Sequence, residues 1–214
     1  MQDVFGFLDD LLEGINFNDE ENAEEVLYGA YTEGAVRLGS LHTGDEFEIS
    51  EMVFIVLGVA QNGGIQVIQK DFLEDRMQFG PDANWKNSPI REYLNSTYYN
   101  FIANAVGEEN IICITRDLTS RDGLDDYGVC EDNISILSER EYAEFHRILG
   151  VNSNYDKWWW TLTPFSAPSN GYSRYVCCVD SDGALSWDFC DGSNGVRPLF
   201  TLESSILVSK HNVE

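Results

Sequence analysis

Three consecutive tryptophans, Trp158 to Trp160, constrain the fold of this chain more than any other run of residues. The segment 158–164 is rich in aromatic residues and threonine and ends at Pro164, which predicts a strand. Side chains alternate along a strand, so Trp158 and Trp160 share one face and Trp159 takes the other. Aromatic area therefore lies on both faces of this strand, and part of it must be covered by loops or left for a partner.

The order of the other predicted elements indicates an α+β fold with antiparallel sheets. Strands are expected at 36–38, 47–49 and 52–59, and the apolar runs on either side of Asn62-Gly63 predict a hairpin with 65–68. Helices are expected at 89–94, 98–105 and 139–149. Ser88 and Pro89 would begin the first of them, and Ser138 with Glu141 forms a capping box for the last.

A second hairpin is predicted near the end of the chain, where residues 175–179 and 184–189 flank an Asp-Ser-Asp-Gly turn. Leu185, Trp187 and Phe189 fall on one face of its second strand, and Ser186 and Asp188 fall on the other. Strands at 195–202 and 205–208 would close the fold.

The charge of the chain is strongly and unevenly negative. Its 37 acidic and 13 basic residues give a net charge of −24, and ten of the acids precede the first basic residue, Arg37. Such a surface disfavours direct binding of nucleic acid or anionic membranes and favours cationic partners. We therefore divide the chain into an acidic helical segment, 1–36, and a main domain, 37–214.

The acidic segment carries Val4, Leu8, Leu11 and Ile15 at helical spacing. Two interpretations stay open: a helix that docks the chain to another subunit of a virion or oligomer, and a helix that packs on its own domain.

No residue pattern predicts catalysis, a metal site or a cofactor. His42, His146 and His211 lack a nucleophile at a useful spacing, and there is no glycine-rich phosphate loop. The five cysteines are odd in number and lack a Cys-x-x-Cys motif, so we expect reduced thiols. Aspartates cluster at 117–126 and 180–191, where calcium ligands and ordinary turn residues are both open readings.

The last third of the chain mixes aromatic residues with Ser, Asn, Asp and Gly, a composition typical of binding loops. Ordinary loop polarity is the alternative interpretation. The predicted binding residues are Trp159, Tyr172, Tyr175, Ser186, Trp187, Asp188 and Asn194.

Several motifs, taken in order, resemble a domain family of unknown function that is common in phages and gut Firmicutes. They are Ser88-Pro89-Ile90-Arg91 followed by Tyr93-Leu94-Asn95, Trp159-Trp160-Thr161-Leu162-Thr163-Pro164, Val179-Asp180-Ser181-Asp182-Gly183 and Gly195-Val196-Arg197-Pro198. The resemblance covers about residues 36–208. The family's tryptophan motif continues with Arg-Ser, and this chain has no arginine there.

The terminal Gly-hydrophobic-Arg pattern is also similar to that of formylglycine-generating enzymes and retroelement-diversified variable proteins. This similarity implies a C-type-lectin-like α+β domain whose late loops form a binding face, with Arg197 and Trp160 as structural residues. Cys178 and Cys190 do not match the copper-binding pair of those enzymes, and the calcium motif of lectins is incomplete.

These observations lead to a non-enzymatic binding module of a phage or prophage, virion-associated, with a protein or glycan ligand. The alternative is an acidic inhibitor that imitates nucleic acid and blocks a host defence nuclease; a degenerate enzyme that binds copper is a third. Since no signal peptide or span of about 20 apolar residues is present, we expect the protein in the host cytoplasm or in a virion.

Overall fold

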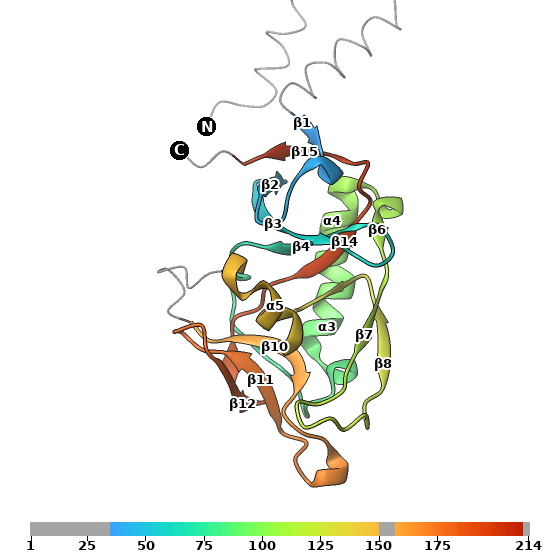
Figure 1. Cartoon of the computed structure of the whole chain (residues 1–214). Helices are drawn as coiled ribbons and strands as arrows, with labels where there is room; N and C mark the ends of the chain where they lie inside the picture. Colours follow the sequence, from blue (N-terminus) through green and yellow to red (C-terminus); the bar gives the residue numbers. More distant parts are fainter. Residues whose placement is uncertain (1–34, 150–156, 212–214) are drawn as a thin grey trace, which may run out of the picture.

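The computed structural model describes residues 35–149 and 157–211. They form a mixed α+β fold of mostly antiparallel strands, in which the largest sheet curls into a half-barrel (Figure 1). The α+β prediction is confirmed. The predicted helices at the acidic N-terminus lie outside the described residues.

The largest sheet contains eight strands of the described chain. They are, in spatial order, β1 (Ala35–Arg37), β15 (Leu207–Lys210), β2 (Glu46–Ile49), β3 (Met52–Val59), β4 (Ile65–Gln69), β14 (Leu199–Leu202) and β6 (Ile111–Ile112), with β9 (Ile134–Ser135) also on β14. The predicted β3–β4 hairpin is confirmed. The predicted domain boundary after residue 36 divides β1, where Ala35 already pairs with Ser209. The largest sheet therefore includes Ala35, which the predicted boundary assigned to the acidic segment.

The predicted helices are present, with one difference. α3 (Pro89–Tyr93), a π-helical turn η3 (Leu94–Tyr98) and α4 (Tyr99–Val106) follow one another without a break, where two separate helices were predicted. Ser88 caps α3, because its hydroxyl accepts a hydrogen bond from the Ile90 N–H group at 3.2 Å. Short 3₁₀ turns occur at η1 (Leu38–Ser40), η2 (Trp85–Asn87), η4 (Glu108–Asn110) and η5 (Pro168–Asn170).

The last helix, α5 (Glu139–Leu149), has the predicted bounds and the predicted capping box. The Ser138 hydroxyl accepts a hydrogen bond from the Glu141 N–H group, and the Glu141 carboxylate accepts one from the Ser138 N–H group. In the described residues no helix has the length and apolar character needed to cross a bilayer.

Both faces of the half-barrel sheet are covered, which explains the near-continuous apolar run of β3. Phe54 and Val56 belong to the main core with Leu94 and Ile102 of the α3–α4 helix. Their neighbours Ile55 and Leu57 point to the other face and pack in a second core with Tyr142 and Leu149 of α5. The sheet is thus enclosed between α3–α4 and α5.

A second, three-stranded sheet lies below α5 in Figure 1 and consists of β10 (Trp159–Pro164), β11 (Tyr175–Val179) and β12 (Leu185–Phe189). The predicted β11–β12 hairpin is confirmed, and its turn ends at Gly183, whose φ of 80° favours glycine. Two short pairs complete the described fold: β5 (Met77–Gln78) with β13 (Ser193–Asn194), and β7 (Ile114–Asp117) with β8 (Val129–Asp132).

Candidate binding surface

The face of the three-stranded sheet that is turned away from the main core is the candidate binding surface, and we call it the outer face. Directly paired residues of antiparallel strands point to the same side, so the register places Trp159 with Val179, Cys177 with Trp187, and Tyr175 with Phe189 on this face. Val176 and Cys178 alternate with them and point into the main core. Along β11 and β12 the outer face is therefore aromatic and apolar.

Helix α5 covers one half of the outer face. Trp159 is 4% exposed and packs edge-on against Tyr142, with their ring centroids 5.4 Å apart. The Tyr142 hydroxyl donates a hydrogen bond to the Gly183 carbonyl at 2.7 Å, which ties the helix to the β11–β12 turn. At the start of α5 the Glu139 N–H group donates to the Thr163 hydroxyl at 2.9 Å. This half of the face is core.

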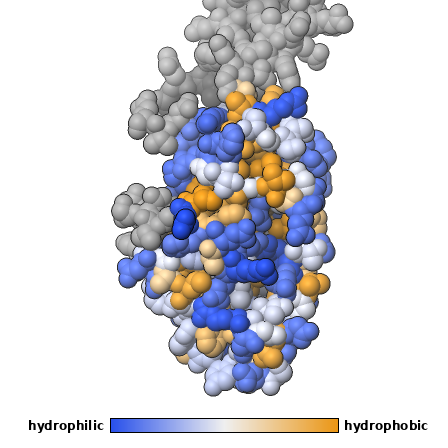
Figure 2. Space-filling view, viewed as in Figure 1, coloured by the Kyte–Doolittle hydropathy of each residue, from blue (hydrophilic) through white to orange (hydrophobic). Residues whose placement is uncertain are grey.

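The other half carries five aromatic side chains, which we call the aromatic patch: Phe165, Tyr172, Tyr175, Trp187 and Phe189. Tyr175 is at its centre, with its ring centroid 4.7 Å from Phe189 and 5.0 Å from Trp187. Tyr172, Phe189 and Trp187 are 52%, 47% and 45% exposed. On the side seen in Figure 2, hydrophobic residues form separate areas among hydrophilic ones. Exposed aromatic clusters are the surfaces on which binding energy concentrates.

An ion pair lies between the two halves. Arg121 is held by Glu139 with an N···O distance of 2.6 Å, and its guanidinium carbon lies 5.5 Å from the centroid of Phe165. Hydrogen bonding to Glu139 raises the pKa of Arg121 above its ordinary value, although burial acts in the opposite direction. Beneath this boundary, burial raises the pKa of the Cys177 thiol, with Glu139 adding to the effect. Cys177 is thus a neutral packing residue.

The structure brings together Tyr172, Tyr175 and Trp187, three of the predicted binding residues. Sequence reasoning missed Phe165 and Phe189 as members of the patch. The alternation of Leu185, Trp187 and Phe189 was visible in the sequence, and it marks the exposed side of β12. A hydrophobic side that faces outward cannot be told from one that faces the core by periodicity alone.

Four other predicted binding residues have different places. Trp159 is buried under α5, so its ring is not part of the exposed surface. Asn194 is buried by other contacts: it is 2% exposed, and its amide binds the Asp188 carboxylate at 2.9 Å and Arg76 at 3.1 Å. Asp188 also accepts a hydrogen bond from the Phe189 N–H group, so it closes the end of β12. Ser186 is half-buried on the inner side of β12.

The residues predicted to be structural are buried. Arg197 is 1% exposed, donates a hydrogen bond to the Gln69 carbonyl at 3.1 Å and lies 5.4 Å from the centroid of Trp159. The Trp160 ring N–H group donates to the Met77 carbonyl at 2.8 Å. Gly195 forms a parallel bridge with Trp159 of β10. Phe72 also approaches Gly195, and a Cβ atom at this position would lie 2.9 Å from the Phe72 ring. Gly-Val-Arg-Pro therefore fixes β10 in place, although the predicted strand at 195–202 starts only at Leu199.

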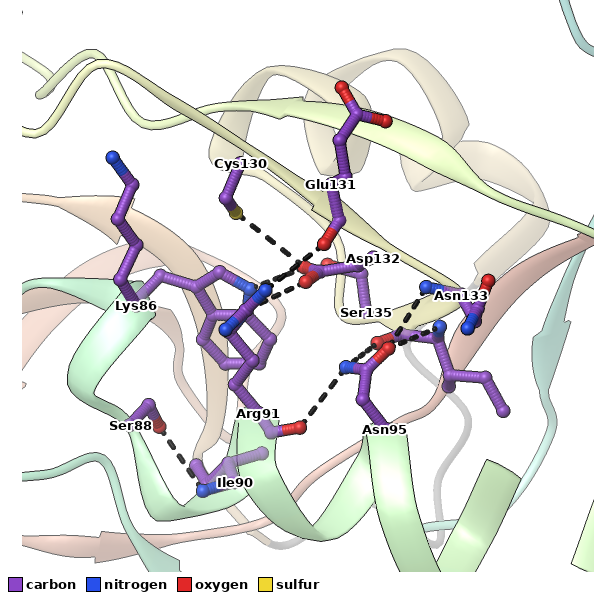
Figure 3. Close-up of polar contacts among 12 residues, drawn as sticks. Lys86, Ser88, Ile90, Arg91, Asn95, Cys130, Glu131, Asp132, Asn133 and Ser135 are labelled. Carbon is purple, nitrogen blue, oxygen red and sulfur yellow. Dashed lines mark hydrogen bonds and ion pairs between the residues drawn. The ribbon is translucent and has the colours of Figure 1, made fainter. Parts of the chain in front are cut away.

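A second polar cluster joins the α3–η3 helix to β8 and β9 (Figure 3). The carboxylate of Asp132 is fully buried and accepts hydrogen bonds from Arg91 at 2.6 Å and from the Trp85 ring N–H group at 2.7 Å. Asn95 binds the backbone of Asn133 and Ile134. Every group in this network has a structural partner, so the Ser-Pro-Ile-Arg and Tyr-Leu-Asn motifs hold the helix on the sheet.

Two aspartates of the 117–126 cluster, Asp122 and Asp126, hold loops together. Asp122 accepts hydrogen bonds from Ser120 and Ser166, and Asp126 accepts two from Ser169. These bonds lower the pKa of Asp122. They also fix the loop that leads to Tyr172. In the described ranges no three His, Cys, Asp or Glu side chains are grouped as metal ligands.

A hollow of about 750 Å³ adjoins the aromatic patch at the start of α5. Arg116 and Arg121 line it, and each is paired with a carboxylate, Glu141 and Glu139 respectively, at 2.6 Å. Leu185 of β12 also lines the hollow, which makes it continuous with the outer face. Arg116 and Arg121 are thus engaged in holding α5, and the aromatic patch stays the best candidate site.

A family model described as a domain of unknown function (DUF6273) matches residues 62–204. The matched range contains the three-stranded sheet, α5 and the buried Arg91 and Arg197 clusters. No curated protein and no solved structure matches the chain.

Proposed function

Since the chain belongs to the DUF6273 family of domains of unknown function, we propose its function from its surface: it is a non-catalytic module that binds a protein through the aromatic patch. One observation carries the proposal. The outer face of the three-stranded sheet is apolar along β11 and β12, and α5 covers only half of the face, which leaves Trp187, Phe189 and Tyr172 about half exposed. Tyr and Trp on a rigid sheet make contacts at low entropic cost.

The surroundings of the patch support a binding role. Asp122 and Asp126 hold the loop that carries Tyr172, and Asp188 with Asn194 closes β12. Hydrogen bonds of this kind, beside the patch, hold its side chains in place before a partner binds. The carboxylates of Asp132 and Glu141 are each bound to an arginine and hold the helices in place, which supports a module without catalysis.

The proposal also includes the C-type-lectin-like scaffold that the resemblance implies. Antiparallel sheets, two helical segments and long late loops support it. The virion-associated setting stays a prediction.

Site-specific photo-crosslinking tests the proposed function. A benzophenone amino acid replaces Tyr172 in the full-length chain, expressed in the cells from which the gene comes, and captured species are identified by mass spectrometry. Phe101, 44% exposed on α4, is the matched control position. We expect a discrete protein product from position 172, lost in the Trp187→Ala background and absent from position 101.

Four results would count against this function. Identical products from positions 172 and 101, or no product from position 172, would remove the patch as the contact surface. A product that glycosidases cleave would identify a glycan partner in place of a protein. A basic nuclease captured independently of Trp187 would favour the acidic inhibitor predicted from the charge.

A further inference from the structure

The three-stranded sheet has an open edge next to the aromatic patch. In the described part of the chain β12 pairs with β11 alone, and it is the outermost strand of this sheet in Figure 1. The pairing runs over five residues without a bulge. Natural edge strands are blunted by bulges, proline or charged side chains. β12, Leu-Ser-Trp-Asp-Phe, has one charge, Asp188, and that carboxylate is bound to Asn194.

The register fixes which backbone groups point to this edge. In an antiparallel pair the hydrogen-bonded positions alternate with positions whose N–H and C=O groups point away. Cys190 donates to the Arg174 carbonyl at 2.8 Å and Asp180 donates to the Ala184 carbonyl at 2.9 Å, so the hydrogen-bonded residues of β12 are Ser186 and Asp188. The backbone groups of Leu185 and Trp187 therefore point to the open edge.

Phe189 shows where this edge ends. Its N–H group donates to the Asp188 carboxylate at 2.8 Å, and its carbonyl accepts from the Gly192 N–H group at 2.8 Å. Two residues, Leu185 and Trp187, are left with outward N–H and C=O groups, enough for four hydrogen bonds to a short strand. Their side chains lie on the outer face, so an added strand would place alternate side chains against Trp187 and Leu185.

The charge of the chain indicates which kind of segment would pair with the open edge of β12. The chain carries −24, so two copies repel each other and a second copy is disfavoured. The turn before β12 contains Asp180 and Asp182, which have no ion pair in the described residues, whereas Asp191 after the strand is paired with Arg174. The arginines beside the patch, Arg121 and Arg174, are each paired with a carboxylate at 2.6 Å.

We propose that β12 binds an extended, lysine- or arginine-rich segment of a partner protein by strand addition, with apolar side chains of that segment on the aromatic patch. This inference rests on the proposed function and names its partner class. Backbone hydrogen bonds to Leu185 and Trp187 provide the pairing, the rings accept the alternate side chains, and the acidic surroundings attract the basic ones.

Residue-resolved amide hydrogen exchange of the full-length chain tests the inference, with a synthetic probe peptide of alternating lysine and valine, Lys-Val-Lys-Val-Lys-Val-Lys, capped at both ends. In the free chain the amides of Ser186 and Asp188 should be protected, and those of Leu185 and Trp187 should exchange fast. A saturating concentration of the peptide should slow amide exchange at Leu185 and Trp187 by about tenfold or more. A peptide with glutamate in place of lysine should leave the exchange rates of both amides unchanged.

Two protein variants accompany the probe. Trp187→Ala should weaken binding of the lysine peptide by about 10- to 30-fold, as expected for a central aromatic contact, and Phe101→Ala should leave it unchanged. Added salt should weaken the binding in both the wild type and Phe101→Ala.

The remaining outcomes overturn strand addition. They are absence of binding, binding without protection of Leu185 and Trp187, and equal binding of the glutamate peptide. Protection in the free chain that rises with protein concentration would show that a second copy occupies the edge. The crosslink from position 172 is independent of the probe, so its persistence would keep the proposed function while strand addition fails.

Discussion

Trp159 and Trp187 lie on the same face of one three-stranded sheet and have opposite surroundings. Trp159 is 4% exposed, enclosed by Tyr142 of α5, Phe72 and the Arg197 guanidinium. Trp187 is 45% exposed, and its ring packs against Phe165, Tyr175 and Phe189 of the aromatic patch. Strand alternation turns both side chains to the outer face, so their different exposure comes from the elements that cover each of them.

One face of the sheet is thus buried in one half and exposed in the other. The half under α5 is core, and the pair Arg121–Glu139 marks where the helix cover ends. Beyond it the rings pack on one another without a cover in the described chain. A residue's contribution therefore depends on its position relative to α5, and the two halves should respond differently to mutation.

The largest effect is expected in the covered half. Trp159→Ala removes a buried ring that contacts Tyr142 and Phe72, and it should lower the free energy of unfolding by about 3–5 kcal/mol. Urea denaturation followed by circular dichroism measures this change. A loss below about 1 kcal/mol would contradict the assignment of the half under α5 to the core, since Trp159 would then behave like a surface residue.

An intermediate effect is expected where α5 is anchored. Burial alone would raise the pKa of Glu141, but hydrogen bonds and charge from Arg116, with the Ser138 contacts, outweigh it and leave the pKa below its ordinary value of 4.5. This lowered pKa contributes stability that is present above pH 4.5 and is lost as the pH falls through the folded-state value. Glu141→Gln should cost about 2 kcal/mol at pH 7, because it leaves Arg116 without its carboxylate.

The measurement is urea denaturation of wild type and Glu141→Gln between pH 3 and pH 7. The two stabilities should converge as the pH falls below 4.5. Glu144→Gln, on the same helix, is the matched control, and it should keep the wild-type profile. A constant difference between wild type and Glu141→Gln across this range would show that the carboxylate charge does not anchor α5.

Local patterns in the sequence predicted most elements of the fold. The β3–β4 and β11–β12 hairpins follow from turn residues between apolar runs, and α5 follows from its capping box. These signals act within a few residues, so they can be read without the tertiary structure. The Tyr172, Tyr175 and Trp187 part of the patch was also visible, as aromatic residues among polar loops.

The exposure of individual residues could not be read in the same way. Trp159 is buried because α5 packs on it, and Asn194 is buried because Arg76, 118 residues earlier, binds its amide oxygen. Both contacts depend on segments distant in sequence. Phe165 and Phe189 were missed for the converse reason, since apolar residues at alternate positions are most often core.

The smallest change in stability is expected in the uncovered half, and it tests the central claim most directly. The measurement is the free energy of unfolding of Trp187→Ala in urea, beside wild type. We expect a loss of about 1 kcal/mol or less, because the ring contacts lie at a half-exposed site. A loss of about 3 kcal/mol or more, the size expected at a buried tryptophan, would contradict it, because Trp187 would then belong to the core.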